Sequence, residues 1–114
     1  MFGLFAPKRV ILRDTRDEDG TRYLDARLEP NGDLIIEGQD LGDGVERFFG
    51  PGEREYEWTW TVKAADVPKL KRALGGGHVL KALKRRFSGS AARDLKPFLV
   101  AHAIPHEVWP RTGD

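Results

Sequence analysis

Two segments of this 114-residue chain alternate with a period of two. In the segment 22–29, Leu24, Ala26 and Leu28 take every second position, and tyrosine or charged residues stand between them. One face of the segment 53–63 carries Tyr56, Trp58, Trp60 and Val62. A period of two is that of a β-strand with one face in solvent, and aromatic and β-branched residues suit a half-buried sheet. The chain is therefore expected to build a sheet with one polar face.

Turn signals divide the first half of the chain into four expected strands, from about residue 9 to residue 63. Asp19-Gly20 closes a polar stretch and is a strong hairpin signal. Pro30-Asn31-Gly32 predicts a second turn, because proline presets φ and asparagine and glycine tolerate positive φ. The apolar runs 10–12 and 34–36 supply the two remaining strands.

The segment 38–52 is expected to be a long connection between the third and fourth strands. It contains five glycines, Pro51 and the pair Phe48-Phe49. Connections of this length are often functional or mobile. Two interpretations of the phenylalanine pair stay open. One phenylalanine plugs the open end of the core, or one is exposed and anchors a partner.

The second half of the chain predicts short helices from about residue 66 to residue 103. Asp66 can cap a helix that Gly75 ends, and a second helix follows over 78–87. A third begins at Ser90 or Asp94, and Pro97 is tolerated only if Asp94 is the cap. The residues 106–109 are expected to form a last extended segment, which suits an edge strand.

These elements predict an α+β fold in a single domain spanning residues 1–114. A four-stranded antiparallel meander is followed by two or three short helices packed on one of its faces. Eleven aromatic residues (three Trp, two Tyr and six Phe) and a 39% hydrophobic content are sufficient for a core. The stripe of Tyr56, Trp58 and Trp60 is either the core face of the sheet or a platform on which bases stack.

The near-zero net charge of +1 hides a segregation along the chain. Residues 14–57 include 14 acidic and 5 basic side chains, whereas residues 64–97 include 9 basic and 2 acidic ones. If the aromatic stripe faces the helices, the outer face of the sheet carries Asp25, Glu29, Glu37, Glu55 and Glu57, with Arg27 as the exception. The expectation is an acidic sheet side and a basic helical side, and the alternative is two ordinary solvated faces.

No constellation of residues predicts catalysis, a metal or a cofactor. The absence of cysteine excludes disulfides, thiolate metal sites and a cysteine nucleophile. The acidic stretches 17–20 and 40–46 do not fit a calcium loop. His102 and His106 have a metal-like spacing, but Pro105 lies between them. Ser88 and Ser90 lack a nucleophile motif. We therefore expect a protein that is not an enzyme.

The chain is expected to be cytoplasmic and to have no membrane partner. No window approaches the ~20 apolar residues that a membrane span needs. The apolar stretch 1–6 is short for a signal peptide, and its charges follow it instead of preceding it.

Two kinds of partner follow from these patterns. The first is another protein, bound through the acidic sheet face and the glycine-rich connection; the residues expected to contact it are Phe48, Phe49, Asp40, Asp43, Glu55 and Glu57. The alternative is nucleic acid, whose phosphates the basic helical side would contact. The residues expected for that role are Lys81, Lys84, Arg85 and Arg86.

The run 33–42 reads DLIIEGQDLG and is followed by Phe49-Gly50 and by Tyr56-Glu57-Trp58. This pattern resembles that of a family of small uncharacterised bacterial proteins, and the resemblance implies no activity and no functional residues. At the level of topology, strands followed by helices also resemble single-strand-binding coactivator and Whirly-type domains. Three helices after the sheet depart from the simplest of those, and their sequence motifs do not occur in this chain.

Overall fold

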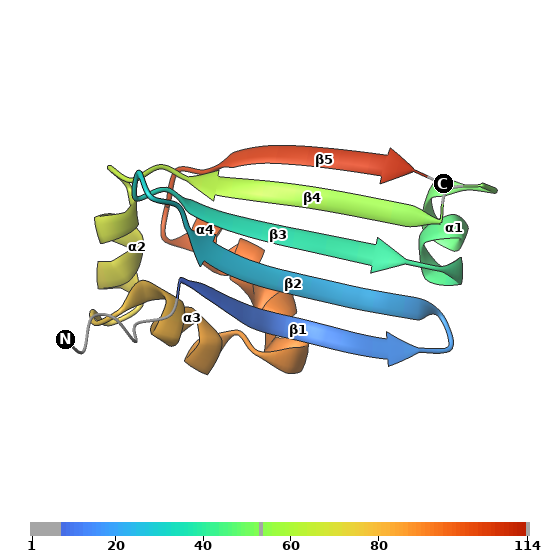
Figure 1. Ribbon diagram of the computed structural model, residues 1–114, viewed down its shortest axis with the longest axis horizontal. Helices are drawn as coiled ribbons and strands as arrows, with labels where there is room; N and C mark the ends of the chain where they lie inside the picture. The colour runs from blue at the N-terminus through green and yellow to red at the C-terminus, as the bar shows by residue number, and fades with distance from the viewer. Residues whose placement is uncertain (1–7, 53, 114) are drawn as a thin grey trace.

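A computed structural model of the protein describes residues 8–52 and 54–113. Its centre is one antiparallel sheet whose strands follow each other in sequence order (Figure 1). The strands are β1 (Arg9–Asp17), β2 (Gly20–Leu28), β3 (Leu34–Leu41), β4 (Glu55–Val62) and β5 (Glu107–Gly113). The α+β class and the antiparallel meander are thus confirmed.

Four α-helices and one 3₁₀ helix accompany the sheet in the described residues. Helix α1 (Asp43–Phe49) connects β3 to β4. The chain between β4 and β5 forms α2 (Val67–Ala73), α3 (Val79–Arg86), the 3₁₀ helix η2 (Gly89–Asp94) and α4 (Leu95–Ala101). The prediction of four strands and two or three helices was therefore too low by one strand and by at least one helix. Helix α1 was missed because the glycines of its segment favour a loop.

The two predicted turns of the first half are confirmed. Asp17 pairs with Gly20 across the β1–β2 hairpin, and Gly20 has a φ of 131°. A Cβ on Gly20 would overlap the carbonyl oxygen of Leu41, so glycine is required there by space as well as by conformation. In the β2–β3 turn, the Gly32 amide donates to the Glu29 carbonyl at 2.9 Å.

The predicted connection 38–52 is largely ordered secondary structure. Strand β3 continues to Leu41, so that Gly38 lies inside the sheet opposite Trp58. Helix α1 then takes up residues 43–49, which corrects the prediction of one long loop. The expected loop thus consists of the end of β3, the two-turn helix α1 and a short connection to β4.

The helix starts expected in the second half at Asp66 and Asp94 are confirmed. Asp66 is the N-cap residue of α2, and Asp94 is that of α4, which places Pro97 in the first turn of α4. The alternative of a continuous helix from Ser90 is wrong, because residues 89–94 form a 3₁₀ helix instead. The extended C-terminal segment is an edge strand, where Pro110 removes no hydrogen bond from the middle of the sheet.

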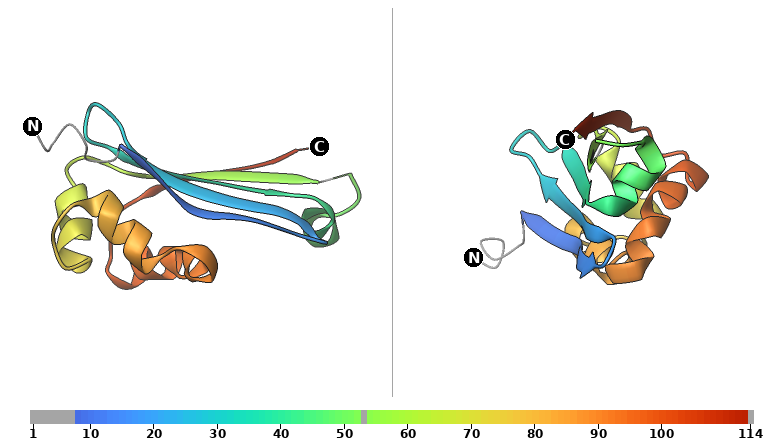
Figure 2. Two further views of the ribbon diagram at one scale, coloured as in Figure 1. Left: turned by 60° about the horizontal axis from the view of Figure 1, so that its bottom comes forward. Right: turned by 90° about the vertical axis from the view of Figure 1, so that its right-hand side faces the viewer.

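Helices α2, α3 and α4 all lie on one face of the sheet, which we call the inner face (Figure 2). Strand residues Leu34, Ile36 and Val62 are fully buried there. The helices contribute most of the other large, fully buried side chains, which are Leu70, Leu80, Leu83, Leu95 and Leu99. The core therefore lies between the inner face and this helical layer.

The helical layer covers only one end of the inner face. The sheet extends beyond it toward α1, which stands at the opposite end (Figure 2, left). The molecule is accordingly elongated, with extents of 48 × 26 × 24 Å. Part of the inner face between η2 and α1 therefore has no helix over it within the described chain.

Candidate binding trough on the inner face

The uncovered part of the inner face is hollowed into two adjoining pockets. One of about 280 Å³ lies against α1, and one of about 200 Å³ lies against η2. Arg22 and Asp40 line both pockets, so the pockets meet on the sheet. We call the combined hollow the trough.

A chain of ring contacts runs along the trough. Successive ring centroids are 4.9, 5.0, 5.3 and 6.3 Å apart. We call this set the aromatic row; in order, its members are Phe48, Phe49, Tyr56, Trp58 and Trp60. The last three project from alternate positions of β4 to the inner face, as a period of two requires. The core interpretation of the stripe is met in part: Trp58 and Trp60 pack against the core, yet Tyr56, Trp58 and Trp60 are only half-buried.

Gly38 lets a tryptophan of the trough lie close to the sheet. It faces Trp58 across the β3–β4 pair, and a Cβ built on it would overlap the indole ring. The indole can therefore lie close to the backbone of β3 only because this position has no side chain.

A β-bulge directs an arginine into the trough. The pairing of β1 with β2 shifts between Ile11 and Arg13, so that Arg13 lies opposite Leu24 on the inner face. Leu12 fills the core beside it. Without the extra residue, simple alternation from Leu12 would place Asp14 on the inner face instead. The bulge thus exchanges an acidic residue for a basic one at this edge.

Four cationic side chains border the aromatic row. Arg13, Arg22 and Arg93 line the pocket against η2. Lys96 of α4 lies over the Trp60 ring, with its Nζ 5.2 Å from the ring centroid. Burial lowers the pKa of Lys96, whose ammonium group donates to His106 Nε2, while His106 Nδ1 donates to the Ile104 carbonyl at 2.7 Å. Of the four, Arg22 is held in an ion pair with Asp17 at 2.9 Å.

Asp40 is the acidic side chain on the floor of the trough. It lies opposite Arg22 on β2 and opposite Tyr56 on β4. Burial raises the pKa of Asp40, and the charges of Arg22 and Arg13 oppose that shift without cancelling it. Asp40 is therefore a carboxyl group in a partly desolvated position between cations and aromatic rings.

Two trough residues carry buried donors without an acceptor in the described chain. In residues 8–52 and 54–113, four buried side-chain polar atoms have no hydrogen-bond partner, and two of them, Arg13 Nε and Trp58 Nε1, belong to trough residues. Both are N–H donors. An unpaired buried donor is costly, and because both atoms are shielded from solvent, that cost belongs to the local packing and not to contacts with a ligand.

The structure separates the residues predicted to bind a protein. Asp40, Phe48 and Phe49 line the pocket against α1. Asp43 lies in α1 and pairs with Arg54 at 2.7 Å. Glu55 and Glu57 lie on the outer face, where both accept hydrogen bonds from Gln39 at 3.0 Å.

Phe48 is 82% exposed and therefore does not plug the core. Phe49 is 41% exposed, and its ring packs on Tyr56. The interpretation in which one phenylalanine is exposed is the one that the structure supports. The predicted set of six residues nevertheless does not form one surface.

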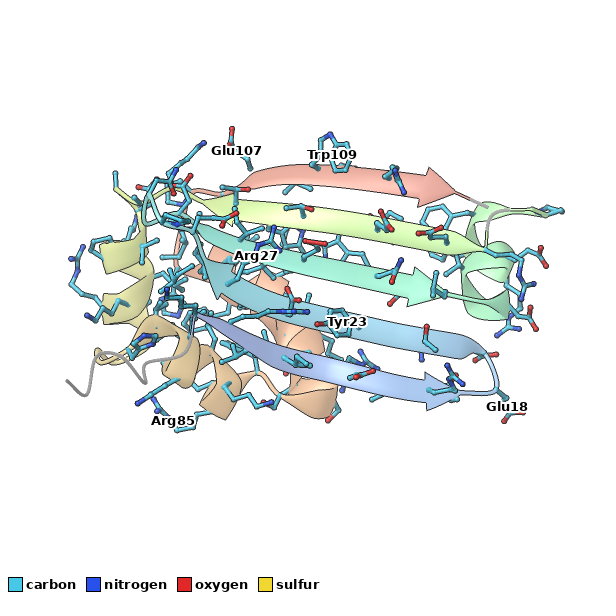
Figure 3. The ribbon with its side chains drawn as sticks, viewed as in Figure 1. Glu18, Tyr23, Arg27, Arg85, Glu107 and Trp109 are labelled. Carbon is cyan, nitrogen blue, oxygen red and sulfur yellow. The ribbon has the colours of Figure 1, made fainter. Side chains whose placement is uncertain are left out.

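The expected acidic outer face is largely balanced by arginine. Arg27 contacts Glu37 at 2.7 Å and Glu29 at 3.6 Å, and Arg111 contacts Glu57 at 3.0 Å. Arg9 pairs with Asp25 at 2.7 Å. A hydrogen bond between the Glu55 and Glu57 carboxyl groups lowers the pKa of Glu55 and raises that of Glu57. Figure 3 shows Tyr23 and Arg27 on this face, turned away from the helices.

The predicted nucleic-acid residues all lie on or near α3 and are exposed. Lys84 donates to the Ile11 carbonyl, and the Arg86 guanidinium lies over the Phe98 ring at 4.8 Å, so both are engaged within the molecule. Lys81 and Arg85 form no ion pair in the described chain. Figure 3 shows Arg85 pointing away from the sheet. None of the four residues lines the trough.

Sequence reasoning did not single out the cations of the trough. The alternation of β2 places Arg22 on the same face as Leu24, so this residue could have been found. Arg13 could not, because the bulge reverses its orientation. Arg93 and Lys96 face the trough through the packing of η2 and α4, for which a single sequence carries no signal.

Other kinds of site find no support in the described residues. No group of three or more His, Asp or Glu side chains that could hold a metal ion occurs in the part of the chain that the structure describes. Among the same residues, no helix has the length and apolar character that crossing a bilayer requires. The chain matches no family model, no curated protein and no solved structure.

Proposed function

We propose that this protein binds single-stranded nucleic acid in the trough. The observation that carries the proposal is the aromatic row, a continuous series of ring contacts bordered by Arg13, Arg22, Arg93 and Lys96. Rings of this kind offer surfaces on which bases stack, and the cations beside them are placed to contact phosphates.

The aromatic row suits unpaired bases. Stacking of a base on an aromatic side chain contributes about 1–3 kcal/mol and tolerates any sequence, because every base has a π-face. Bases in a duplex are already stacked and paired, so only a single strand or a loop presents them to such a surface. A duplex groove admits a protruding helix or a two-stranded ribbon. The trough is instead a hollow on the sheet between η2 and α1, so it does not fit into such a groove.

The charges of the trough agree with a polyanionic ligand. Arg13 and Arg93 form no ion pair in the described chain, so their charges remain available. Binding that rests on a few phosphate contacts weakens with salt, with a slope of about −0.7 per contact on a log–log plot for a single strand.

The test is fluorescence anisotropy with fluorescein-labelled dT12 and U12 at low salt, using wild type and two variants. Tyr56→Ala is expected to weaken binding about tenfold, because it removes one stacking ring. Trp109→Ala is the matched control: this aromatic residue is 61% exposed, and it lies on the outer face opposite Thr59. Its loss is expected to leave the affinity unchanged.

Two outcomes would overturn the proposal. Wild type that binds neither oligonucleotide at low salt has no such function. Equal losses in Tyr56→Ala and Trp109→Ala would remove the trough from the binding surface. Thermal melting of each variant separates a binding defect from a loss of the fold.

Docking of another protein through Phe48 is the second candidate function. An 82% exposed phenylalanine beside a second aromatic ring is typical of an interface anchor. Proteins captured from a cell lysate by wild type but not by Phe48→Ala would support it. Val100→Ala is the control, because Val100 is also an apolar residue and is 63% exposed. If nuclease treatment abolishes the capture, nucleic acid bridges the captured proteins, and the result supports the first proposal instead.

A further inference from the structure

Asp40 occupies the centre of the trough floor. It is the point where the two pockets meet, and its cross-strand neighbours are Arg22 and Tyr56. The Arg22 guanidinium is engaged by Asp17 at 2.9 Å. The Asp40 carboxyl itself accepts no hydrogen bond and forms no ion pair from residues 8–52 or 54–113.

The half-buried Asp40 carboxyl has no donor from the described protein, so solvent alone satisfies its oxygens, and the group is partly desolvated. Its environment agrees with this view, since burial raises the pKa of Asp40 although two arginines lie near. A ligand that brings N–H donors to this point would offset the cost of desolvation. The phosphates of a nucleic acid cannot do so, because they carry acceptors only. In DNA the donor must therefore come from a base, whereas in RNA the ribose 2′-hydroxyl is a second source.

The position of Asp40 relative to Tyr56 selects the edge of that base. Residues directly opposite in an antiparallel pair have Cβ atoms about 4.5–5.5 Å apart. A base stacked on the Tyr56 ring therefore has one edge within reach of the Asp40 carboxyl. In a single strand that edge can be the Watson–Crick edge, which is free of a partner.

Guanine is the base whose Watson–Crick edge matches a carboxylate. It presents two neighbouring donors, the N1–H group and the 2-amino group, to the two carboxylate oxygens. Thymine and uracil present one N–H between two carbonyl oxygens, which a carboxylate repels. Adenine and cytosine present one amino group beside an acceptor nitrogen.

We propose that Asp40 makes the trough selective for guanine in single-stranded nucleic acid. The inference rests on the proposed function and names the base that this function prefers. It assigns Asp40 the role of a specificity-determining residue, which reads the base stacked on Tyr56, while the cations hold the backbone on either side.

The experiment compares labelled dT12 with two oligonucleotides of the same length, in which one central thymine is replaced by guanine or by hypoxanthine. Hypoxanthine keeps the N1–H donor and lacks the 2-amino group. Wild type is expected to bind the guanine oligonucleotide about tenfold more tightly than dT12, as a good bidentate contact allows. The hypoxanthine oligonucleotide is expected to lose most of that preference.

Asp40→Asn supplies the decisive comparison. The variant has one acceptor oxygen instead of two. It also removes a negative charge near the phosphates, which changes the affinity for every oligonucleotide. The readout is therefore the ratio of the affinity for the guanine oligonucleotide to that for dT12. That ratio is expected to fall to about one. Asp43→Asn is the matched control. Asp43 lies in α1, pairs with Arg54 and does not line the trough. It is expected to keep the ratio of wild type.

The failures of the two proposals are distinguishable. Wild type that binds dT12 without preferring guanine overturns the role of Asp40 and leaves nucleic-acid binding standing. A guanine preference that persists in Asp40→Asn, or that hypoxanthine retains in full, also overturns it. Wild type that binds none of the three oligonucleotides overturns both proposals.

Discussion

A missing side chain decides the shape of the trough at the scale of single residues. Trp58 can lie against β3 because Gly38 has only a hydrogen where other residues carry a Cβ. Its Nε1 is buried there without an acceptor, so the packing is not optimal for the tryptophan itself. The position of the indole, and with it the depth of the trough, depends on one glycine.

A pair of glycine-to-alanine substitutions tests this dependence. Gly38→Ala is expected to destabilise the protein by about 1–3 kcal/mol, as overpacking does, because the new methyl group overlaps the indole. Gly44→Ala is the control: its Cβ would meet Asp19 at an ordinary 3.5 Å, and it lies inside α1. It is expected to be neutral or to stabilise by up to ~1 kcal/mol through helix propensity. Urea unfolding followed by circular dichroism measures both.

The outcome would count against the proposed packing if Gly38→Ala were as stable as Gly44→Ala. In that case Trp58 would have room to move away from β3. A red shift of the tryptophan emission in Gly38→Ala would agree with a displacement of the Trp58 indole, because the exposed Trp109 is unchanged in the variant.

Some of these single-residue features could be predicted from the sequence and others could not. The face of Tyr56, Trp58 and Trp60 follows from alternation and was predicted. That Gly38 belongs to a strand was not, because glycine in a glycine-rich segment indicates a loop. The orientation of Arg13 depends on a bulge, and a bulge changes the face of every later residue in its strand without a mark in the local sequence.

At the scale of elements, the uncovered half of the inner face has a geometric cause. Helices α2, α3 and α4 have 7 or 8 residues, and the strands have 7 to 9. An α-helix rises about 1.5 Å per residue and a strand about 3.3 Å, so these helices are about half as long as the strands or shorter. The helical layer therefore reaches only part of the way along the sheet (Figure 2).

The core side of that layer should carry the stability of the fold. Leu99 of α4 is fully buried, whereas Val100, the next residue, is 63% exposed. Leu99→Ala is expected to cost about 2–5 kcal/mol, because it leaves a cavity between α4 and the sheet. Val100→Ala is expected to stay within about 0.5 kcal/mol of wild type. Urea unfolding measures both variants.

Equal stability of Leu99→Ala and Val100→Ala would mean that α4 does not dock as described. The trough would then lose the boundary that η2 and α4 form. This measurement therefore tests the architecture on which both binding proposals depend.

The elements themselves were predicted better than their arrangement. The N-cap residues Asp66 and Asp94 and the periodicity over 78–87 located the helices of the second half. Amphipathic periodicity shows that a helix buries one face, but it does not show against which part of a sheet. The extent of the covered area follows from packing between segments distant in sequence, which local patterns do not encode.

At the scale of the whole molecule, the charge segregation of the sequence is rearranged by folding. Several acidic residues of the first half pair with arginines, as Arg27–Glu37 shows on the outer face at 2.7 Å. Cations from β1, β2, η2 and α4 gather at the trough instead. The distribution of charge that a ligand meets is thus set by pairing in three dimensions and not by sums along the chain.

Two charge-matched double variants distinguish the trough from the basic surface of α3. Arg13→Ala/Arg93→Ala and Lys81→Ala/Arg85→Ala each remove two positive charges, and none of the four residues forms an ion pair in the described chain. Their effect on net charge, and hence on long-range attraction of a polyanion, is the same. A difference in affinity for dT12 therefore reports local contacts with phosphate.

The trough variant is expected to bind dT12 at least tenfold more weakly at low salt. Its log–log salt dependence should be shallower by about 1.4, since two phosphate contacts at about 0.7 each are lost from a single strand. The α3 variant should keep the slope of wild type. The reverse result would assign phosphate binding to Lys81 and Arg85, whose side of the molecule faces away from the aromatic row, and stacking on that row would then have no part in the interaction.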